Sequence, residues 1–496
     1  MQYVFIVNHK PKTFEQLEFD NTYSRLSEPF YRRVNPTPLP NPYLVTYSSS
    51  VAELLGITDS EFERNETVEF LTGNRLLSGS EPISAIYAGH QFGVWVPQLG
   101  DGRAILLGEI KSPSGKRFDI QLKGAGLTPF SRMGDGRAVL RSTIREFLCS
   151  EAMHALGIPT TRALAITGSE APVYREKIET AAVLTRVAES HVRFGTFELF
   201  ASRNQTEEVR ILADYVIEDH FPDLKKEADK YLLFFRDVIS RTAKLLAKWQ
   251  AVGWSHGVMN TDNMSIIGLT MDYGPFGFLD EFDPAFVCNH SDHSGRYAYH
   301  QQPAIGLWNL SCLGQALLSV VKREDAIAAL DTYENIFVDE YFRLMREKLG
   351  LHEQRDEDTE LISELLLMMQ QSAVDYTSFF RRLSSLNFDT GSGNWDVKGM
   401  FVDPVSFDDW MRRYLERAKS EKEADLNQRM KSVNPKYILR NHIAQKAIEM
   451  AEAGDFTEIH KLLDIFSKPF DDQDVDQFYE APPALGSPKL VVSCSS

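Results

Sequence analysis

The stretch His256-Gly-Val-Met-Asn-Thr-Asp-Asn263, followed nine residues later by Asp272-Tyr-Gly274, decides the fold of this 496-residue chain. It is a short polar loop that leads through an apolar run to a second polar turn. Asparagine and aspartate oxygens are the ligands that hard cations such as Mg²⁺ and Mn²⁺ prefer. Asn263 and Asp272 are therefore predicted to hold one of these ions.

The same two segments match the pattern of protein kinases, His-Arg-Asp-x-x-x-x-Asn followed by Asp-Phe-Gly. His256 and Asn263 fit this pattern, but Val258 stands where kinases have their catalytic aspartate. The usual base is therefore missing, and Asp262 supplies another carboxylate beside the predicted metal ligand. A polar loop with an Asx turn is the alternative, which the order and spacing of the motifs disfavour.

A lysine and a glutamate upstream complete the kinase-like set. Lys123 ends a strand-like run, and Glu146 lies midway along the helix expected over 137–156. In kinases such a pair presents the lysine ammonium to the nucleotide phosphates. By itself the pair is weak evidence, because lysines at strand ends are usually solvated.

The element Gly-Asp-Gly-Arg occurs twice, at 100–103 between strands and at 134–137 opening a helix. Glycines let backbone amides approach an oxyanion, and a helix N-terminus adds free N–H groups. Each element can be a phosphate cradle or simply a tight turn. No Gly-x-x-x-x-Gly-Lys-Ser/Thr sequence occurs, which excludes an ordinary P-loop.

The periodicity predicts an α/β (α+β) protein with a small lobe of sheet and helix and a larger helical lobe, and the motifs above indicate that this two-lobed fold is kinase-like. Strands are expected over 104–109, 118–122, 163–167 and 181–187, and a long helix over 231–249. The expected units are an N-terminal wrapping extension (1–80), a lobe of sheet and helix (81–200), a helical lobe with the catalytic and metal-binding loops (201–325), and a helical C-terminal extension (326–496).

Composition limits the classes of partner. The net charge of −17 leaves no overall basic field for nucleic acid, and no apolar window is long enough to span a bilayer. The first twenty residues lack the apolar segment of a signal peptide, so a cytoplasmic protein, expected to be a monomer, is predicted.

Four cysteines without a CxxC pair argue against a disulfide scaffold and a structural zinc site. Cys149 and Cys312 fall in apolar helices and are predicted to be buried.

Several longer runs resemble the SelO family of protein nucleotidyltransferases. They are Tyr87-Ala-Gly-His-Gln-Phe-Gly, Leu122-Lys-Gly-Ala-Gly, Arg132-Met-Gly-Asp-Gly-Arg-Ala, the two segments that begin at Gly257 and Met271, and Gly295-Arg-Tyr-Ala-Tyr. The likeness extends from about Phe30 to the C-terminal Cys-Ser-Ser. It implies a kinase-like fold in which the nucleotide lies reversed, so that AMP moves to a protein and pyrophosphate leaves.

The resemblance also implies the roles of individual residues. ATP, with UTP as the alternative donor, is expected to modify Ser, Thr, Tyr or His side chains with Mg²⁺ or Mn²⁺. An ordinary kinase and a nucleotide-binding scaffold without activity are the competing interpretations. The implied set is Gly100, Gly102 and Arg103 in the glycine-rich loop, Lys123, Asp135, Gly136, Glu146, Arg186 and Arg193 in the nucleotide site, Asn263 and Asp272 at the metal, Asp262 as the proton acceptor, and Cys288 with Cys494 as a redox disulfide.

Overall fold

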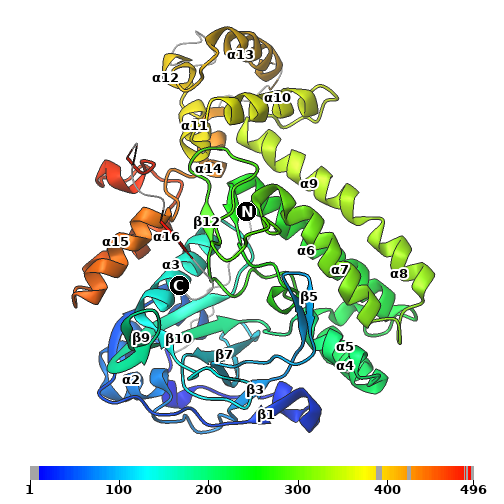
Figure 1. The fold of residues 1–496 in the computed structure, drawn as a ribbon, viewed down its shortest axis with the longest axis vertical. Coiled ribbons are helices and arrows are strands. Elements are labelled where there is room, and N and C mark those ends of the chain that lie inside the picture. Colours follow the sequence, from blue (N-terminus) through cyan, green and yellow to red (C-terminus); the bar gives the residue numbers. More distant parts are fainter. Residues whose placement is uncertain are drawn as a thin grey trace.

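The computed structural model describes residues 11–386, 394–419, 421, 426–484, 486 and 490–492. An antiparallel sheet occupies the N-terminal part of the chain, and helices make up most of the remainder (Figure 1). The predicted mixed α/β class with a helical C-terminal region is confirmed.

The main sheet has the strand order β1-β3-β6-β7-β10-β9-β2, with β8 paired to β10 outside this path. All of its pairings are antiparallel. Two small sheets pair β4 with β5 and β11 with β12. The strands are β1 (Tyr31–Arg33), β2 (Tyr43–Tyr47), β3 (Ile83–Ala85), β4 (Gly89–Gln91), β5 (Val94–Val96), β6 (Ala104–Lys111), β7 (Arg117–Lys123), β8 (Ala138–Val139), β9 (Arg162–Tyr174), β10 (Ile178–Ala188), β11 (Trp254–Ser255) and β12 (Gly277–Phe278).

Alternation along the strands buries both faces of the main sheet. In β6, Ile105 and Leu107 belong to a core shared with the N-terminal extension, whereas Leu106 belongs to the core that contains the helix α3 (Leu140–Ala155). Successive strand residues point to opposite faces, so one strand serves two cores. The sheet is thereby held between the extension and α3.

The N-terminal extension also takes part in the sheet itself. Its strands β1 and β2 lie at the two ends of the strand order. They are therefore the edge strands, and because they are short they expose only a short row of unpaired backbone N–H and C=O groups. The segment expected only to wrap around the fold therefore completes its sheet.

Sixteen α-helices are described. The long helix α6 ends at Gly253, which has φ +74 and caps the helix in the left-handed conformation. The helices α9 to α14 contribute to a separate apolar core, and α15 and α16 return to pack against α3 (Figure 1). The remaining helices are α1 (Ser49–Leu55), α2 (Asn65–Thr72), α4 (Phe194–Ser202), α5 (Thr206–His220), α6 (Lys230–Val252), α7 (Gln302–Ala316), α8 (Arg323–Leu330), α9 (Tyr333–Lys348), α10 (Asp358–Gln371), α11 (Tyr376–Leu383), α12 (Asn394–Lys398), α13 (Pro404–Ala418), α14 (Leu426–Val433), α15 (Asn441–Glu452) and α16 (Thr457–Ser467).

The four predicted strands and the two predicted helices are present. One boundary was wrong: the second Gly-Asp-Gly-Arg element does not open a helix, because Ala138 and Val139 pair with β10 as β8 before α3 begins. Its amides are therefore not those of a helix N-terminus. Within the described ranges, no helix is both long and apolar enough to cross a membrane.

Arg440 joins the C-terminal helices to the rest of the helical region. Its side chain is 1% exposed, and its two terminal nitrogens lie 2.8 and 2.9 Å from the carboxylate oxygens of Asp375. It also contacts Asp280 in the loop after β12. One buried cation therefore links three segments that are far apart in the sequence.

We expect Arg440→Ala to lower the free energy of unfolding by about 3–5 kcal/mol, because it leaves the carboxylate of Asp375, which is only 11% exposed, without its partner. Arg343→Ala is the matched control, since it removes an ion-paired arginine that is 44% exposed on α9 and should cost about 0–1 kcal/mol. Urea unfolding of both variants measures the difference. Equal losses in the two variants would contradict the assigned role of Arg440.

Candidate functional site

Lys123 and Glu146 meet between the sheet and α3. Lys123 is the last residue of β7, and its ammonium contacts Oε2 of Glu146 on the buried face of α3. The Glu146 side chain is only 3% exposed. Burial, with help from the nearby charge of Arg186, lowers the pKa of Lys123 to about 8. The contact fixes the helix against the sheet.

Arg186 extends this pair toward the loop that contains Asp272. It lies on β10, beside β7, and its Nε donates to Oε1 of Glu146 at 2.5 Å. One of its terminal nitrogens, Nη2, lies 2.8 Å from Oδ1 of Asp272. The two carboxylates are therefore bridged by one guanidinium, which is 4% exposed.

Arg193 holds the other side of Asp272. It is the residue before α4, and its Nη1 donates to Oδ2 of Asp272 at 2.6 Å and to the backbone carbonyl of Asp262. Although burial opposes ionisation, Arg193, Arg186 and Lys123 hold the pKa of Asp272 well below its usual range. Asp272 has a φ of +61, a conformation that is uncommon for residues other than glycine and that the surrounding contacts must maintain.

The loop 256–263 is positioned by its own polar side chains. The ring of His256 is buried, and its Nε2 lies 2.9 Å from the carbonyl oxygen of Met271, which fixes the segment before Asp272. The amide of Asn263 donates to the carbonyl of Val258 at 3.0 Å. That bond orients the amide and leaves its Oδ1 available as an acceptor.

Asp262 lies in a buried pocket beside β4. Its Oδ2 accepts a hydrogen bond of 3.2 Å from Gln91, and its Oδ1 is buried without a hydrogen-bond partner in the described part of the chain. Burial raises the pKa of Asp262 to about 6. A buried carboxylate with a free oxygen is suited to accept a proton or a cation.

The first Gly-Asp-Gly-Arg element lies close to this network. Asp101 is buried, and its carbonyl accepts from the hydroxyls of Ser84 and Thr128, so the loop is anchored below its tip. Arg103 is exposed to solvent, yet the surrounding protein lowers its pKa. The charge of Arg186 adds to this shift, whereas the charge of Glu146 opposes it. Arg103 is therefore a solvent-exposed cation close to the network.

The second Gly-Asp-Gly-Arg element is joined to the turn between β9 and β10 by an ion pair. Asp135 is 42% exposed and forms a two-pronged ion pair with Arg175, at 2.8 and 2.9 Å. Arg175 is near enough to Arg103 for its charge to lower the pKa of that residue. Gly136 packs against the backbone of Gly126. The structure thus places Asp135 and Gly136 outside the buried network.

Two residues of this region were missed in the sequence. Gln91 lies within the run 87–93 that carries the family resemblance, so a signal for it was present. Arg175 lies in the turn between β9 and β10, and no motif marks it. Only the antiparallel pairing of these strands places that turn near the second Gly-Asp-Gly-Arg element.

The cysteines lie in three different environments. Cys149 is buried in α3 as predicted, but Cys312 is partly exposed, so the prediction that it is buried was wrong. The reason is that its side chain faces β4 and α4 and not the apolar core. Cys288 is 8% exposed and lies beside Ser255 and Pro275, and burial raises its pKa to about 12. Cys494 lies outside the described residues.

The oxygen donors of the site fit a hard divalent cation. Asn263 offers a free Oδ1, and each oxygen of Asp272 that accepts from an arginine keeps a second lone pair. A set made of oxygen atoms alone suits Mg²⁺ or Mn²⁺ better than a softer metal.

Comparison with known proteins places the chain in a family. The family model described as "Protein adenylyltransferase SelO" matches residues 13–467, nearly the whole chain. This chain belongs to the SelO family. Its predicted membership is therefore confirmed, and the family places it among the nucleotidyltransferase enzymes.

Relatives of similar length support this placement. SelO-family proteins named "Protein nucleotidyltransferase YdiU" are 55% identical in Myxococcus xanthus and 54% identical in Thiobacillus denitrificans, each over 98% of this chain and all of the relative. The protein of the same name from Klebsiella pneumoniae is 52% identical over 94% of this chain and 97% of its own length. The likeness therefore covers the sheet, the loops of the site and most of the helical region.

Gly89→Ala should impair nucleotide transfer without unfolding the protein. A Cβ at residue 89 would lie 2.6 Å from Oδ1 of Asp262, so the carboxylate must move. A displacement of about 1 Å at a reacting group can cost about 10²-fold in rate. We expect a loss of kcat of this order, measured by transfer of nucleotide label at saturating donor.

Val94→Ala is the control, because Val94 pairs with Gln91 in the same hairpin and is 68% exposed. Its kcat should stay within about twofold of the parent, since surface substitutions of this kind have small effects. An unchanged kcat in Gly89→Ala would show that the position of the Asp262 carboxylate does not matter for transfer.

Proposed function

We propose that this SelO-family enzyme transfers AMP from ATP to a side-chain hydroxyl of another protein and releases pyrophosphate. The supporting observation is the buried network in which three cations, Lys123, Arg186 and Arg193, face two carboxylates, Glu146 and Asp272. Its excess positive charge favours phosphate groups. The name of the matching family, protein adenylyltransferase, agrees with AMP as the transferred group.

We further propose a kinase-like, two-lobed arrangement around this network. A strand lysine paired with a helix glutamate, followed by an asparagine loop and an aspartate turn, is the arrangement of kinases. On this proposal, residues 81–200 form the lobe of sheet and α3, and residues 201–325 form the helical lobe with both loops. Residues 1–80 and 326–496 are the two extensions.

The nucleotide is proposed to lie reversed relative to that of a kinase, with its terminal phosphate among guanidinium groups. Arg186 and Arg193 are nearly buried and fixed by carboxylates, which suits a phosphate that is held and not transferred. Gly100, Gly102 and Arg103 would form the glycine-rich loop over the nucleotide, and Asp135 with Gly136 would complete the nucleotide site. The donor is ATP, with UTP as the alternative.

The reaction requires one proton acceptor. The oxygen of the target hydroxyl forms a bond to the α-phosphorus, the bond from that phosphorus to the bridging oxygen breaks, and pyrophosphate leaves with the electron pair. Asp262 takes the hydroxyl proton on its free Oδ1, while Gln91 holds Oδ2. Asn263 and Asp272 would hold Mg²⁺ or Mn²⁺, which would neutralise charge on the phosphates.

Targets with Ser, Thr or Tyr, and a His as a further acceptor, are the proposed protein substrates. That the protein is a cytoplasmic monomer, and that it binds neither nucleic acid nor a membrane, are still predictions. The acidic net charge of −17 agrees with the exclusion of nucleic acid.

Isotope position tests the proposal directly. Incubation with ATP labelled at the α-phosphate should label an acceptor protein, and ATP labelled at the γ-phosphate should not. Label from the γ-position would establish a kinase instead. No label from either donor, with nucleotide binding intact, would favour a scaffold without activity. Intact-protein mass with ATP and with UTP identifies the donor.

Asp262→Asn should lower the rate of transfer by about 10²- to 10⁴-fold, the usual contribution of a general base. The affinity for nucleotide should change little, because the cations of the network remain in place. Glu189→Gln is the control, since it neutralises a surface carboxylate that is 42% exposed. A rate equal to that of the parent would exclude Asp262 as the proton acceptor.

We also propose that Cys288 and Cys494 form a regulatory disulfide. The backbone N–H of His290 donates to the carbonyl of Val492 at 2.8 Å, which brings the C-terminal segment beside the loop that follows Cys288. Because the Cys288 thiol is buried and its pKa is raised to about 12, the loop must open before the thiol reacts.

Hydrogen peroxide is a suitable oxidant for the test, since it takes two electrons and two protons from the thiols and becomes two water molecules. Peptide mapping without reductant should then find Cys288 joined to Cys494. Transfer activity should change on oxidation and recover with dithiothreitol, and Cys494→Ser should not respond. Two unlinked cysteines after oxidation would disprove the pairing.

A further inference from the structure

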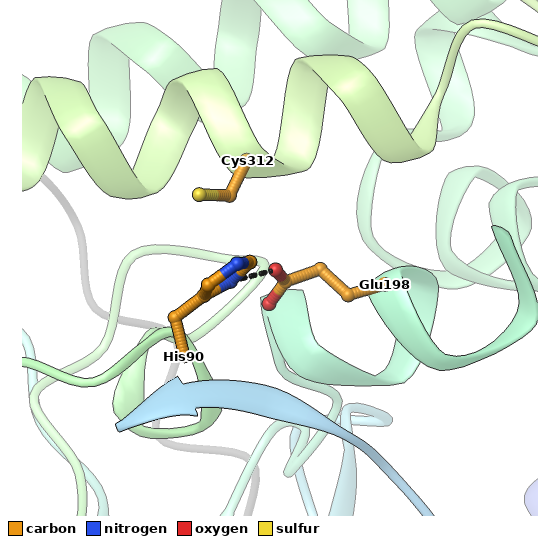
Figure 2. Close-up of side chains that lie close together, drawn as sticks. All are labelled: His90, Glu198 and Cys312. Atoms are coloured by element: carbon orange, nitrogen blue, oxygen red, sulfur yellow. Dashed lines mark hydrogen bonds and ion pairs between the residues drawn. The ribbon is translucent and has the colours of Figure 1, made fainter. Parts of the chain in front are cut away.

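Three potential metal ligands from distant parts of the chain meet outside the network of Lys123 and Asp272. His90 lies on β4, Glu198 on α4 and Cys312 on α7. One ligand atom from each, a ring nitrogen, a carboxylate oxygen and the sulfur, lies within 4.8 Å of the other two. Figure 2 shows the sulfur of Cys312 and the carboxylate of Glu198 on either side of the His90 ring.

Glu198 is the buried member of this cluster. Its side chain is 4% exposed, and its Oε1 lies 2.7 Å from Nδ1 of His90. Its other oxygen, Oε2, is buried and forms no hydrogen bond of ordinary geometry in the described ranges, although the Thr261 hydroxyl lies near the carboxylate. Burial raises the pKa of Glu198, an effect that the nearby Thr261 hydroxyl and His90 oppose. A buried acceptor with no donor costs free energy unless a cation or a water satisfies it.

We propose that His90, Glu198 and Cys312 bind one Zn²⁺ ion. Zinc is the ion that best suits a mixed set of imidazole nitrogen, carboxylate oxygen and thiolate sulfur. Its bonds of about 2.0–2.3 Å require the three ligands to draw together from their present separation. His90 is 25% exposed, so water can reach the fourth position.

The cysteine is protonated without the ion and loses its proton when the ion binds. Burial and the charge of Glu198 raise the pKa of Cys312 to about 12, whereas Arg296 lowers it. Zinc displaces the thiol proton to solvent and forms a bond to the sulfur, with no change of oxidation state. Arg296 lies over the Trp308 ring, which in turn lies 5.1 Å from the His90 ring, so a cation borders the cluster on one side.

The cluster is joined to the catalytic loop through β4. The backbone N–H of His90 donates to Oγ1 of Thr261 at 2.8 Å, while Gly89 and Gln91 on either side contact Asp262. An ion bound by His90 would therefore fix β4 against α4 and α7, next to the residue proposed as the base. The ion is distinct from the one proposed for Asn263 and Asp272, whose ligands are oxygen atoms.

Metal titration of the full-length protein can separate the two sites. We would remove metal with chelator and titrate Zn²⁺ into the parent protein by calorimetry under reducing conditions, with excess Mg²⁺ present to occupy the oxygen site. One equivalent per chain should bind. Cys312→Ser or His90→Ala should abolish this binding, whereas Ser311→Ala, a neighbouring surface change on the same helix, should preserve it.

Cobalt gives a readout that does not depend on activity or on the proposed nucleotide transfer. Co²⁺ bound by the parent protein should show a thiolate-to-metal charge-transfer band, and Cys312→Ser should lose that band while the protein stays folded by circular dichroism. Absence of the band in the folded parent would overturn the proposal. Its persistence in Cys312→Ser would do so as well.

Discussion

The carboxylate of Asp272, held between Arg186 and Arg193, is the constraint on which the rest of the structure depends. The two arginines come from β10 and from the residue before α4, and Asp272 comes from the loop that follows the segment 256–263. Burying these charges is costly unless each one is paired and hydrogen-bonded. The sheet, α4 and both loops are therefore required to keep one relative position, and Glu146 extends that requirement to α3.

The appended segments support this arrangement from two sides. The N-terminal strands complete both ends of the sheet that carries Lys123 and Arg186. The helices α15 and α16 pack on α3, which carries Glu146, and Arg440 ties their start to the helical region. Segments that carry none of the proposed catalytic groups thus hold the elements that do. These contacts explain why the chain is longer than a single core requires: the added segments stabilise the elements that carry Lys123, Arg186 and Glu146.

The short strand β4 lies between the Asp262 carboxylate and the proposed zinc ligands. Gly89 and Gln91 contact the carboxylate proposed as the base, and His90 between them points into the cluster with Glu198 and Cys312. Successive residues of a strand face opposite sides, so one three-residue strand can serve a reacting group on one side and an ion on the other. Its position would then couple the proposed zinc site to the geometry at Asp262.

The sequence by itself determined the mixed class, the main strands and helices, and the residues of the two loops, because apolar periodicity and short motifs are local. It also identified Lys123 and Glu146, whose contact the structure provides. Tertiary structure alone decided that β8 precedes α3, that Arg175 pairs with Asp135, and that Cys312 faces His90 and Glu198. These outcomes depend on strand pairing and helix packing between residues that can be more than two hundred positions apart, as His90 and Cys312 are. The spacing of residues along the chain cannot predict these contacts. The absence of a CxxC pair, for example, does not indicate whether Cys312 lies beside His90 and Glu198.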